Sequence, residues 1–131
     1  MATIFFFTVF FSSLDYKLVR YDTTNDTSTV IQNMGNDVSS LIEYNDLIYG
    51  TGKVGGVYGL KQYDPNTGSV DQISSIFPKR TPVGHNGVLY FPADSNGGLN
   101  GLGVYQLNSG NPVFYEPINS QNGFLLSNLA K

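Results

Sequence analysis

The sequence predicts an all-β fold, and more specifically a β-propeller built from four-stranded antiparallel blades. Three observations lead to this prediction: the composition, an internal repeat, and turn signals that divide each repeat into short segments. The chain has 131 residues, of which 15 are glycine, 9 tyrosine and 9 phenylalanine, and only 13% are charged. Such a composition favours short strands joined by tight turns over helices.

Charge and cysteine content exclude several classes of function. The net charge of -3 argues against a broad basic surface, so we expect no nucleic-acid partner. The absence of cysteine excludes disulfides and thiolate nucleophiles. The apolar run Ile4–Phe11 is too short to cross a bilayer as a helix, and it lacks the flanking residues of a signal peptide. We therefore expect a buried strand there and no insertion into a membrane.

The internal repeat is the main evidence for the fold. Tyr16–Asp22 resembles Tyr58–Asp64 about 42 residues further along, and Asn45–Tyr49 resembles Asn86–Tyr90 at nearly the same spacing. Asparagine-led pairs such as Asn45-Asp46 and Asn86-Gly87 stand between apolar segments and are typical of two-residue hairpin turns. A repeat of this length that contains four short strands predicts a propeller blade.

The turn signals place the strands of each repeat in order. The first repeat has three expected strands, at Ile4–Phe11, Tyr16–Asp22 and Thr29–Asn33. The second has four, at Val38–Tyr44, Leu47–Thr51, Val57–Tyr63 and Ser69–Ile73. The third has four, at Thr81–His85, Val88–Ala93, Leu102–Leu107 and Pro112–Glu116. The second and third repeats each begin with a strand that the first repeat lacks.

An apolar segment after the third repeat, Phe124–Asn128, has the character of that first strand. We therefore divide the single domain into blades at 1–37, 38–77 and 78–118, with 119–131 completing a blade of a second chain. Three blades are fewer than closed propellers contain, so we expect a homodimer with six blades, or an open filament made by the same strand exchange. The expected interface residues are Ile4, Phe5, Phe6, Phe7, Phe124, Leu125 and Leu126.

The second repeat also resembles a known family. Leu47–Gly52, Gly55-Gly56 and Gly59–Gly68 are similar to the GloVer-type tandem repeat of bacterial surface proteins, and more distantly to kelch repeats. The third repeat is similar in its double glycine Gly97-Gly98, whereas the first has Ser12–Asp15 in that place. The resemblance implies a propeller-like fold and an extracytoplasmic setting, and it supplies neither catalytic residues nor a cofactor.

No pattern in the sequence indicates catalysis, so we predict that the protein is not an enzyme. His85 is the one histidine, and no nucleophile motif accompanies it. Asp22 and Asp94–Asn96 offer oxygen atoms but lack the loop spacing of a calcium site, so we expect them in turns. The double glycines are not followed by the lysine of a phosphate-binding loop, and we interpret them as conformationally permissive backbone between strands. We expect no metal and no cofactor.

We expect binding on the face where the longer loops meet, because function concentrates on loops held by a rigid scaffold. Amide side chains and tyrosines suit carbohydrate hydroxyls and ring faces, but they also suit protein surfaces. We therefore predict a binding module that recognises a carbohydrate or a protein, with a structural assembly protein as the alternative. The candidate ligand-binding residues are Lys53, Arg80, Asp94, Asn96 and Asn100.

Overall fold

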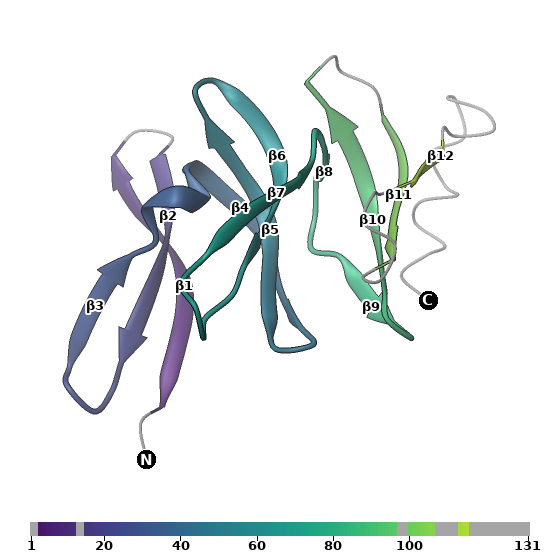
Figure 1. Ribbon diagram of the computed structural model, residues 1–131. Coiled ribbons are helices and arrows are strands. Elements are labelled where there is room, and N and C mark those ends of the chain that lie inside the picture. The colour runs from purple at the N-terminus through teal and green to yellow at the C-terminus, as the bar shows by residue number, and fades with distance from the viewer. Residues whose placement is uncertain (1–2, 13–14, 97–99, 107–112, 116–131) are drawn as a thin grey trace.

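Three antiparallel sheets make up the described part of the chain, and they follow one another across Figure 1 in sequence order. The computed structural model describes residues 3–12, 15–96, 100–106 and 113–115. These ranges contain no α-helix, and one short 3-10 helix, η1 (Gln32–Met34), follows the first sheet. No helix within them is long and apolar enough to cross a membrane. The prediction of an all-β chain with antiparallel sheets is confirmed.

The second sheet has four strands in chain order: β4 (Asn36–Tyr44), β5 (Leu47–Val54), β6 (Val57–Tyr63) and β7 (Val70–Ser74). Asn45 and Asp46, between β4 and β5, have φ angles of 51° and 63°. Two consecutive residues with positive φ form the hairpin turn whose twist matches that of the strands. The hairpin expected at this asparagine is therefore confirmed.

The β5–β6 turn consists of Gly55 and Gly56, with φ angles of 60° and 82°. A Cβ atom added to either glycine would meet nothing within 4 Å. Glycine is therefore favoured here by the backbone conformation rather than by crowding. This agrees with the interpretation of the double glycine as conformationally permissive backbone between two strands.

The first sheet contains β1 (Ile4–Ser12), β2 (Asp15–Asp22) and β3 (Thr27–Val30), in that order. The expectation of a strand over Thr29–Asn33 is wrong in its second half, because the strand ends at Val30 and η1 follows. The turn into η1 brings Met34 into the core, where its side chain is fully buried. Gly35, with φ of 90°, then directs the chain into β4.

The third sheet is built around β10 (Val88–Ser95), which pairs with β11 (Asn100–Gln106), and β11 pairs with β12 (Val113–Tyr115). On its other side β10 pairs with two short strands, β8 (Ile76–Pro78) and β9 (Val83–His85). The expected strand over Thr81–His85 therefore begins later and has a second piece upstream. Proline has no N–H to donate to a ladder, and Pro78 and Pro82 stand where the pairing stops and resumes.

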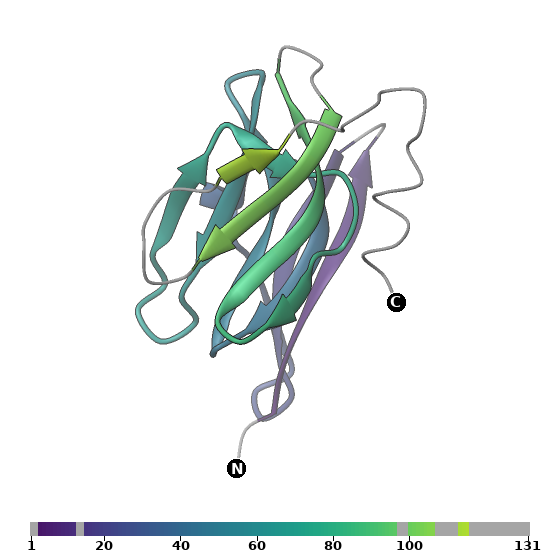
Figure 2. The same ribbon diagram turned by 90° about the vertical axis from the view of Figure 1, so that its right-hand side faces the viewer.

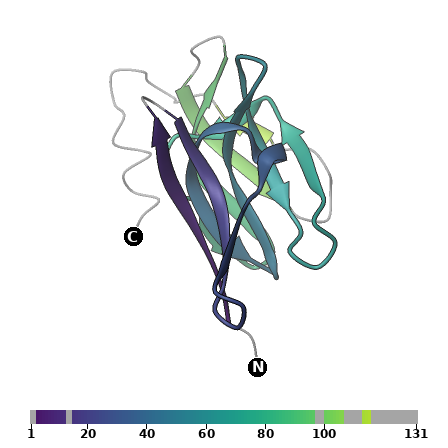
Figure 3. The ribbon, with the colours of Figure 1, turned by 90° about the vertical axis from the view of Figure 1, so that its left-hand side faces the viewer.

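Hydrophobic side chains pack between neighbouring sheets and hold the sheets face to face. There are two such hydrophobic clusters, one between the first and second sheets and one between the second and third. Alternate residues of a strand point to opposite faces, so Ile48 lies in the first cluster and Tyr49 in the second. Figures 2 and 3, viewed from the sides of the third and first sheets, show this stacked arrangement. The second sheet thus contributes to both cores.

The matching tyrosines of the repeats do not all pack in the same way. Tyr49 and Tyr63 are buried between sheets, at 1% and 3% exposure. Tyr21 and Tyr90 are only partly buried. The hydroxyl of Tyr21 donates to Asp26 in the β2–β3 turn, so this tyrosine fixes a turn instead of filling a core.

Candidate functional site

A cleft of about 530 Å³ lies between the second and third sheets, at the end where β5 turns into β6 and where β10 ends. We call it the β6–β10 cleft. This volume falls within the range of small-ligand sites. The cleft has aromatic, charged and hydroxyl-bearing side chains in its wall, contributed by Ser39, Thr51, Tyr58, Phe77, Lys79, Asp94, Ser95 and Asn96.

Aromatic rings form one wall of the cleft. The ring centroids of Tyr58 and Phe77 lie 5.2 Å apart with the planes tilted by 32°. The Lys53 ammonium lies 5.0 Å from the centroid of the Tyr58 ring, within the range of a cation–π interaction. The Tyr58 hydroxyl donates a hydrogen bond to Asp37, and this bond, with a smaller effect of burial, raises the pKa of the phenol. Tyr58 is therefore held by contacts on its ring and at its tip.

Asn96 joins the two sheets across the mouth of the cleft. Its Oδ1 accepts from the backbone N–H of Tyr58 and its Nδ2 donates to the Tyr58 carbonyl, both at 2.9 Å. Deeper inside, the Thr51 hydroxyl donates to the Pro78 carbonyl at 2.6 Å. These bonds between sheets fix the width of the cleft.

An ion pair lies at the exposed side of the cleft. The Lys79 ammonium is 3.9 Å from the Asp94 carboxylate, and the two side chains are 46% and 25% exposed. Ion pairs near the surface contribute little to stability. The Asp94 carboxylate also accepts a hydrogen bond from the Ser95 N–H at 2.7 Å. The cleft therefore combines an aromatic wall with a pair of opposite charges.

The predicted ligand-binding residues are only partly brought together. Asp94 and Asn96 line the cleft, and Lys53 contacts its tyrosine. Arg80 is exposed between β8 and β9 and is not among the residues that line the cleft. Asn100 is the first residue of β11, where its backbone is in register with Asp94.

Sequence reasoning missed both aromatic residues of the cleft. Tyr58 follows the double glycine by one residue, and this position next to a loop was a usable signal. Phe77 belongs to β8, a strand that the sequence-based prediction did not contain. No local signal marked Phe77 as a neighbour of Tyr58, because the two residues belong to different sheets of the folded chain.

A second candidate surface is the β1 edge, which we define as the side of β1 that faces away from β2. Within the described residues β1 pairs with β2 alone, whereas β5 and β10 have strands on both sides. Ile4 and Phe6 are partly buried toward the core, while Phe5 and Phe7 are 47% and 49% exposed. Phe10 is 57% exposed. The prediction of a buried strand over Ile4–Phe11 is therefore right about the strand and wrong about its burial in this chain, because most of its side chains are exposed. The other expected interface residues, 124–126, lie outside the described residues.

The residues considered for catalysis and metal binding lie at exposed strand ends and in turns. His85 is exposed at the end of β9, and its Nε2 lies 3.1 Å from the side-chain nitrogen of Asn86. The Asp22 carboxylate accepts from the Thr24 N–H at 2.8 Å and from the Asn25 amide at 3.2 Å, as expected for a turn. In the part of the chain that the structure describes, no three His, Asp or Glu side chains gather closely enough to hold a metal ion.

A solved structure shares the arrangement of the sheets. The crystal structure of TolB from Acinetobacter baumannii matches this chain with a TM-score of 0.58 at 15% sequence identity, over 91% of this chain and 33% of TolB. The chain thus spans about a third of the length of TolB. No family model matches the sequence, and no curated protein matches it. At this identity the likeness concerns the fold alone. The chain is therefore an all-β protein with a propeller-like fold.

Proposed function

We propose that this chain is a non-enzymatic binding module, with three propeller blades per chain, that recognises a carbohydrate or a protein through the β6–β10 cleft. The observation that carries the proposal is the aromatic wall formed by the partly exposed Tyr58 ring and the buried Phe77 ring, beside the Lys79–Asp94 pair. Aromatic faces next to polar groups bind amphipathic ligands such as sugar rings, because one surface meets the apolar ring and the other its hydroxyls.

The location of the cleft supports binding over catalysis. It lies at the loop end of the sheets, where function concentrates on a rigid scaffold. His85, the candidate acid–base residue, is in register with Val88, at the other end of β10 from Asp94. General acid–base work needs such a group within hydrogen-bonding reach of the ligand. The charged groups of the cleft therefore serve recognition in this proposal.

A glycan array combined with pull-down experiments tests the proposal. Wild-type protein is compared with Tyr58→Leu, which removes the aromatic face, and with Tyr16→Leu, a matched change at a tyrosine that is 42% exposed on β2. We expect wild-type protein and Tyr16→Leu to bind the same ligands. We expect Tyr58→Leu to lose about tenfold or more in affinity, as is usual for an aromatic residue at the centre of a site.

Two results would contradict the proposal. The first is the absence of both glycan hits and pull-down partners for the wild-type protein. The second is a ligand that Tyr58→Leu binds as tightly as wild-type protein does, because that ligand would use another surface.

A specific observation also favours the alternative function, a structural assembly protein that forms rings or filaments. The β1 edge has apolar side chains on both faces of the strand, a pattern typical of strands that are covered on both sides. A long apolar edge also readily pairs with a strand from another chain. We propose that a second copy supplies this strand from residues 124–128, which gives a homodimer with six blades or an open filament.

Light scattering and electron microscopy test the assembly. Phe7→Lys places a charge on the exposed face of β1, and Val83→Lys is a control on β9 with a similar exposure, 46% against 49%. We expect dimers or fibres for wild-type protein and Val83→Lys, and monomers for Phe7→Lys. Monomers in all three samples would contradict strand exchange. Discrete rings would favour the binding module, and fibres would favour the assembly protein.

A further inference from the structure

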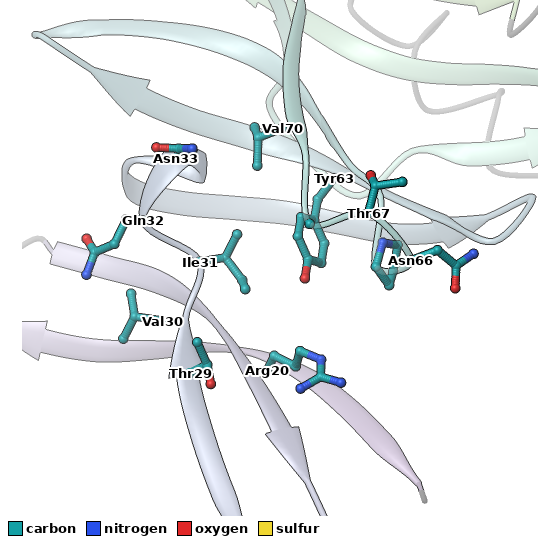
Figure 4. A pocket seen from close by; sticks show the side chains of 12 residues that line it. Arg20, Thr29, Val30, Ile31, Gln32, Asn33, Tyr63, Asn66, Thr67 and Val70 are labelled. Atoms are coloured by element: carbon teal, nitrogen blue, oxygen red, sulfur yellow. The ribbon is translucent and has the colours of Figure 1, made fainter.

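A second hollow of about 530 Å³ lies between the first and second sheets, on the side away from the β6–β10 cleft. We call it the Arg20 groove. Figure 4 shows Arg20 and Tyr63 facing each other at one end, and Gln32 and Asn33 at the other. Strands β2 and β6, the segment around η1 and the β6–β7 turn supply these residues. None of them was a candidate in the sequence.

Arg20 is the only described cation that lines this hollow. It is partly buried on β2, where it is in register with Phe6 on one side and Thr29 on the other. No carboxylate of the described residues forms an ion pair with it; the ion pairs recorded there involve Lys17 and Lys79. A partly buried guanidinium with this environment is a natural partner for an external anion.

Tyr63 offers a hydrogen-bond donor beside this cation. Its ring is buried against Phe6, with the ring centroids 5.7 Å apart, and its hydroxyl points to Arg20 in Figure 4. Burial and, to a smaller extent, the Asp64 carboxylate raise the pKa of the phenol, and the Arg20 charge opposes them only in part, so the hydroxyl keeps its proton at neutral pH. The guanidinium and the phenol can therefore donate together to the two oxygens of one carboxylate.

The rest of the hollow is suited to a ring that carries hydroxyls. Ile31, Pro65 and Val70 give it apolar surface, and exposed amides of Gln32, Asn33 and Asn66 stand at its rim. A single cation in a chain of net charge -3 matches one isolated carboxylate better than a polyanion. We propose that the Arg20 groove binds an acidic monosaccharide unit, with its carboxylate on Arg20 and Tyr63 and its ring against Ile31 and Pro65.

Titration followed by NMR tests this assignment on the full chain. The probes are galacturonate, galactose as its neutral counterpart, and a short peptide that contains glutamate. We expect galacturonate to bind with a dissociation constant of about 1 mM and to bind more weakly as salt is added. We expect galactose and the peptide to bind at least about tenfold more weakly, because each lacks half of the recognised features.

Three variants locate the site. Arg20→Gln removes the cation, Tyr63→Phe keeps the buried ring but removes the hydroxyl, and Arg80→Gln is a control with the same change of charge at an exposed position. We expect a loss of about tenfold or more for Arg20→Gln and of severalfold for Tyr63→Phe, and no change for Arg80→Gln. If Arg20→Gln fails to fold, the reduced affinity of Tyr63→Phe for galacturonate still tests the location of the site.

Several outcomes would overturn the assignment. Absence of galacturonate binding, equal binding of galactose, or equal binding by wild-type protein and Arg20→Gln would each do so. Stronger binding of the peptide would identify the groove as a site for acidic peptides instead. The inference does not depend on the β6–β10 cleft, because a Tyr58→Leu variant that has lost its ligand should still bind galacturonate.

Discussion

At the scale of single residues, the main electrostatic feature is a group of tyrosines with a raised pKa. Among the described residues the pKa lies above the ordinary value of 10.0 for Tyr21, Tyr49, Tyr58, Tyr63 and Tyr105. Burial is the first cause for Tyr49, Tyr63 and Tyr105. A raised pKa means that the folded state favours the protonated phenol. The corresponding stability is complete below the pKa of the unfolded chain and is lost as the pH rises through the folded value.

Tyr49 gives the sharpest prediction from this feature. Burial raises its pKa to about 12, so we expect the free energy of unfolding to decline from about pH 10 upward. In Tyr49→Phe this decline should be less steep, because one of the protonated phenols has been removed. Urea denaturation followed by circular dichroism at pH 8, 10 and 11 measures the effect. Tyr16→Phe, at an exposed position, is the control, and equal slopes in Tyr49→Phe and wild-type protein would contradict the argument.

Asn96 gives a second prediction at this scale. Asn96→Ala removes both hydrogen bonds to the Tyr58 backbone, which should destabilise the protein by about 1–2 kcal/mol. It should also weaken any ligand of the β6–β10 cleft, because Asn96 holds the two walls together. Thermal unfolding measures the first effect, and Asn66→Ala, at another exposed asparagine, is the control. An unchanged midpoint in Asn96→Ala would show that the sheets are held by other contacts.

At the scale of elements, Gly52 on β5 makes room for η1. A Cβ atom at this position would lie 1.9 Å from the Met34 carbonyl oxygen, which is far closer than atoms approach. The glycine therefore lets η1 cross the sheet and place the Met34 side chain in the core between the first and second sheets. The backbone of η1 cannot keep its position if position 52 has a side chain.

We expect Gly52→Ala to destabilise the protein by about 2–4 kcal/mol, because either η1 or the strand must move. The denaturation midpoint measures this loss. Val54→Ala, at an exposed position of the same strand, should stay within about 0.5 kcal/mol of wild-type protein. A Gly52→Ala protein as stable as wild-type protein would mean that η1 shifts without cost.

The strands were predictable where local signals are strong, and the sites were not. Asn45-Asp46 and Asn86-Gly87 both form positive-φ turns, because the required backbone conformation is a property of the dipeptide. The strand β9 was predicted within Thr81–His85, but the upstream piece β8 was missed, since two prolines interrupt the pattern of one strand. Arg20 and Tyr63 belong to different repeats and meet only when the first sheet packs on the second. The spacing of the two residues in the sequence therefore does not predict their proximity.

At the scale of the whole molecule, the structure has the arrangement of a propeller segment, and two of its features concern partners. The β1 edge is open within the described residues, and two hollows lie between successive sheets. Phe7→Lys tests the first, and Tyr58→Leu and Arg20→Gln test the hollows separately. Tyr58 is on a different sheet from Phe7 and Arg20, so the effect of Tyr58→Leu should be independent of the other two. Phe7 and Arg20 are on paired strands, so their effects can be coupled.

The position of the second sheet between two cores predicts a gradient of local stability. Its strands β5 and β6 contribute to both clusters, so their amides should exchange with solvent most slowly. The amides of β1 and β9, which pair on one side only, should exchange faster. Hydrogen exchange followed by mass spectrometry measures this order. The fastest exchange in β5 or β6 would contradict it.

The order of strands within the sheets has a consequence for the kinetics of folding. Strands β4 to β7 pair with their neighbours in sequence, so the second sheet forms by closing short loops, which costs little conformational entropy. Once formed, it offers an apolar surface on each face. The first and third sheets can then condense on it in either order, so folding has two parallel routes that begin in the middle of the chain.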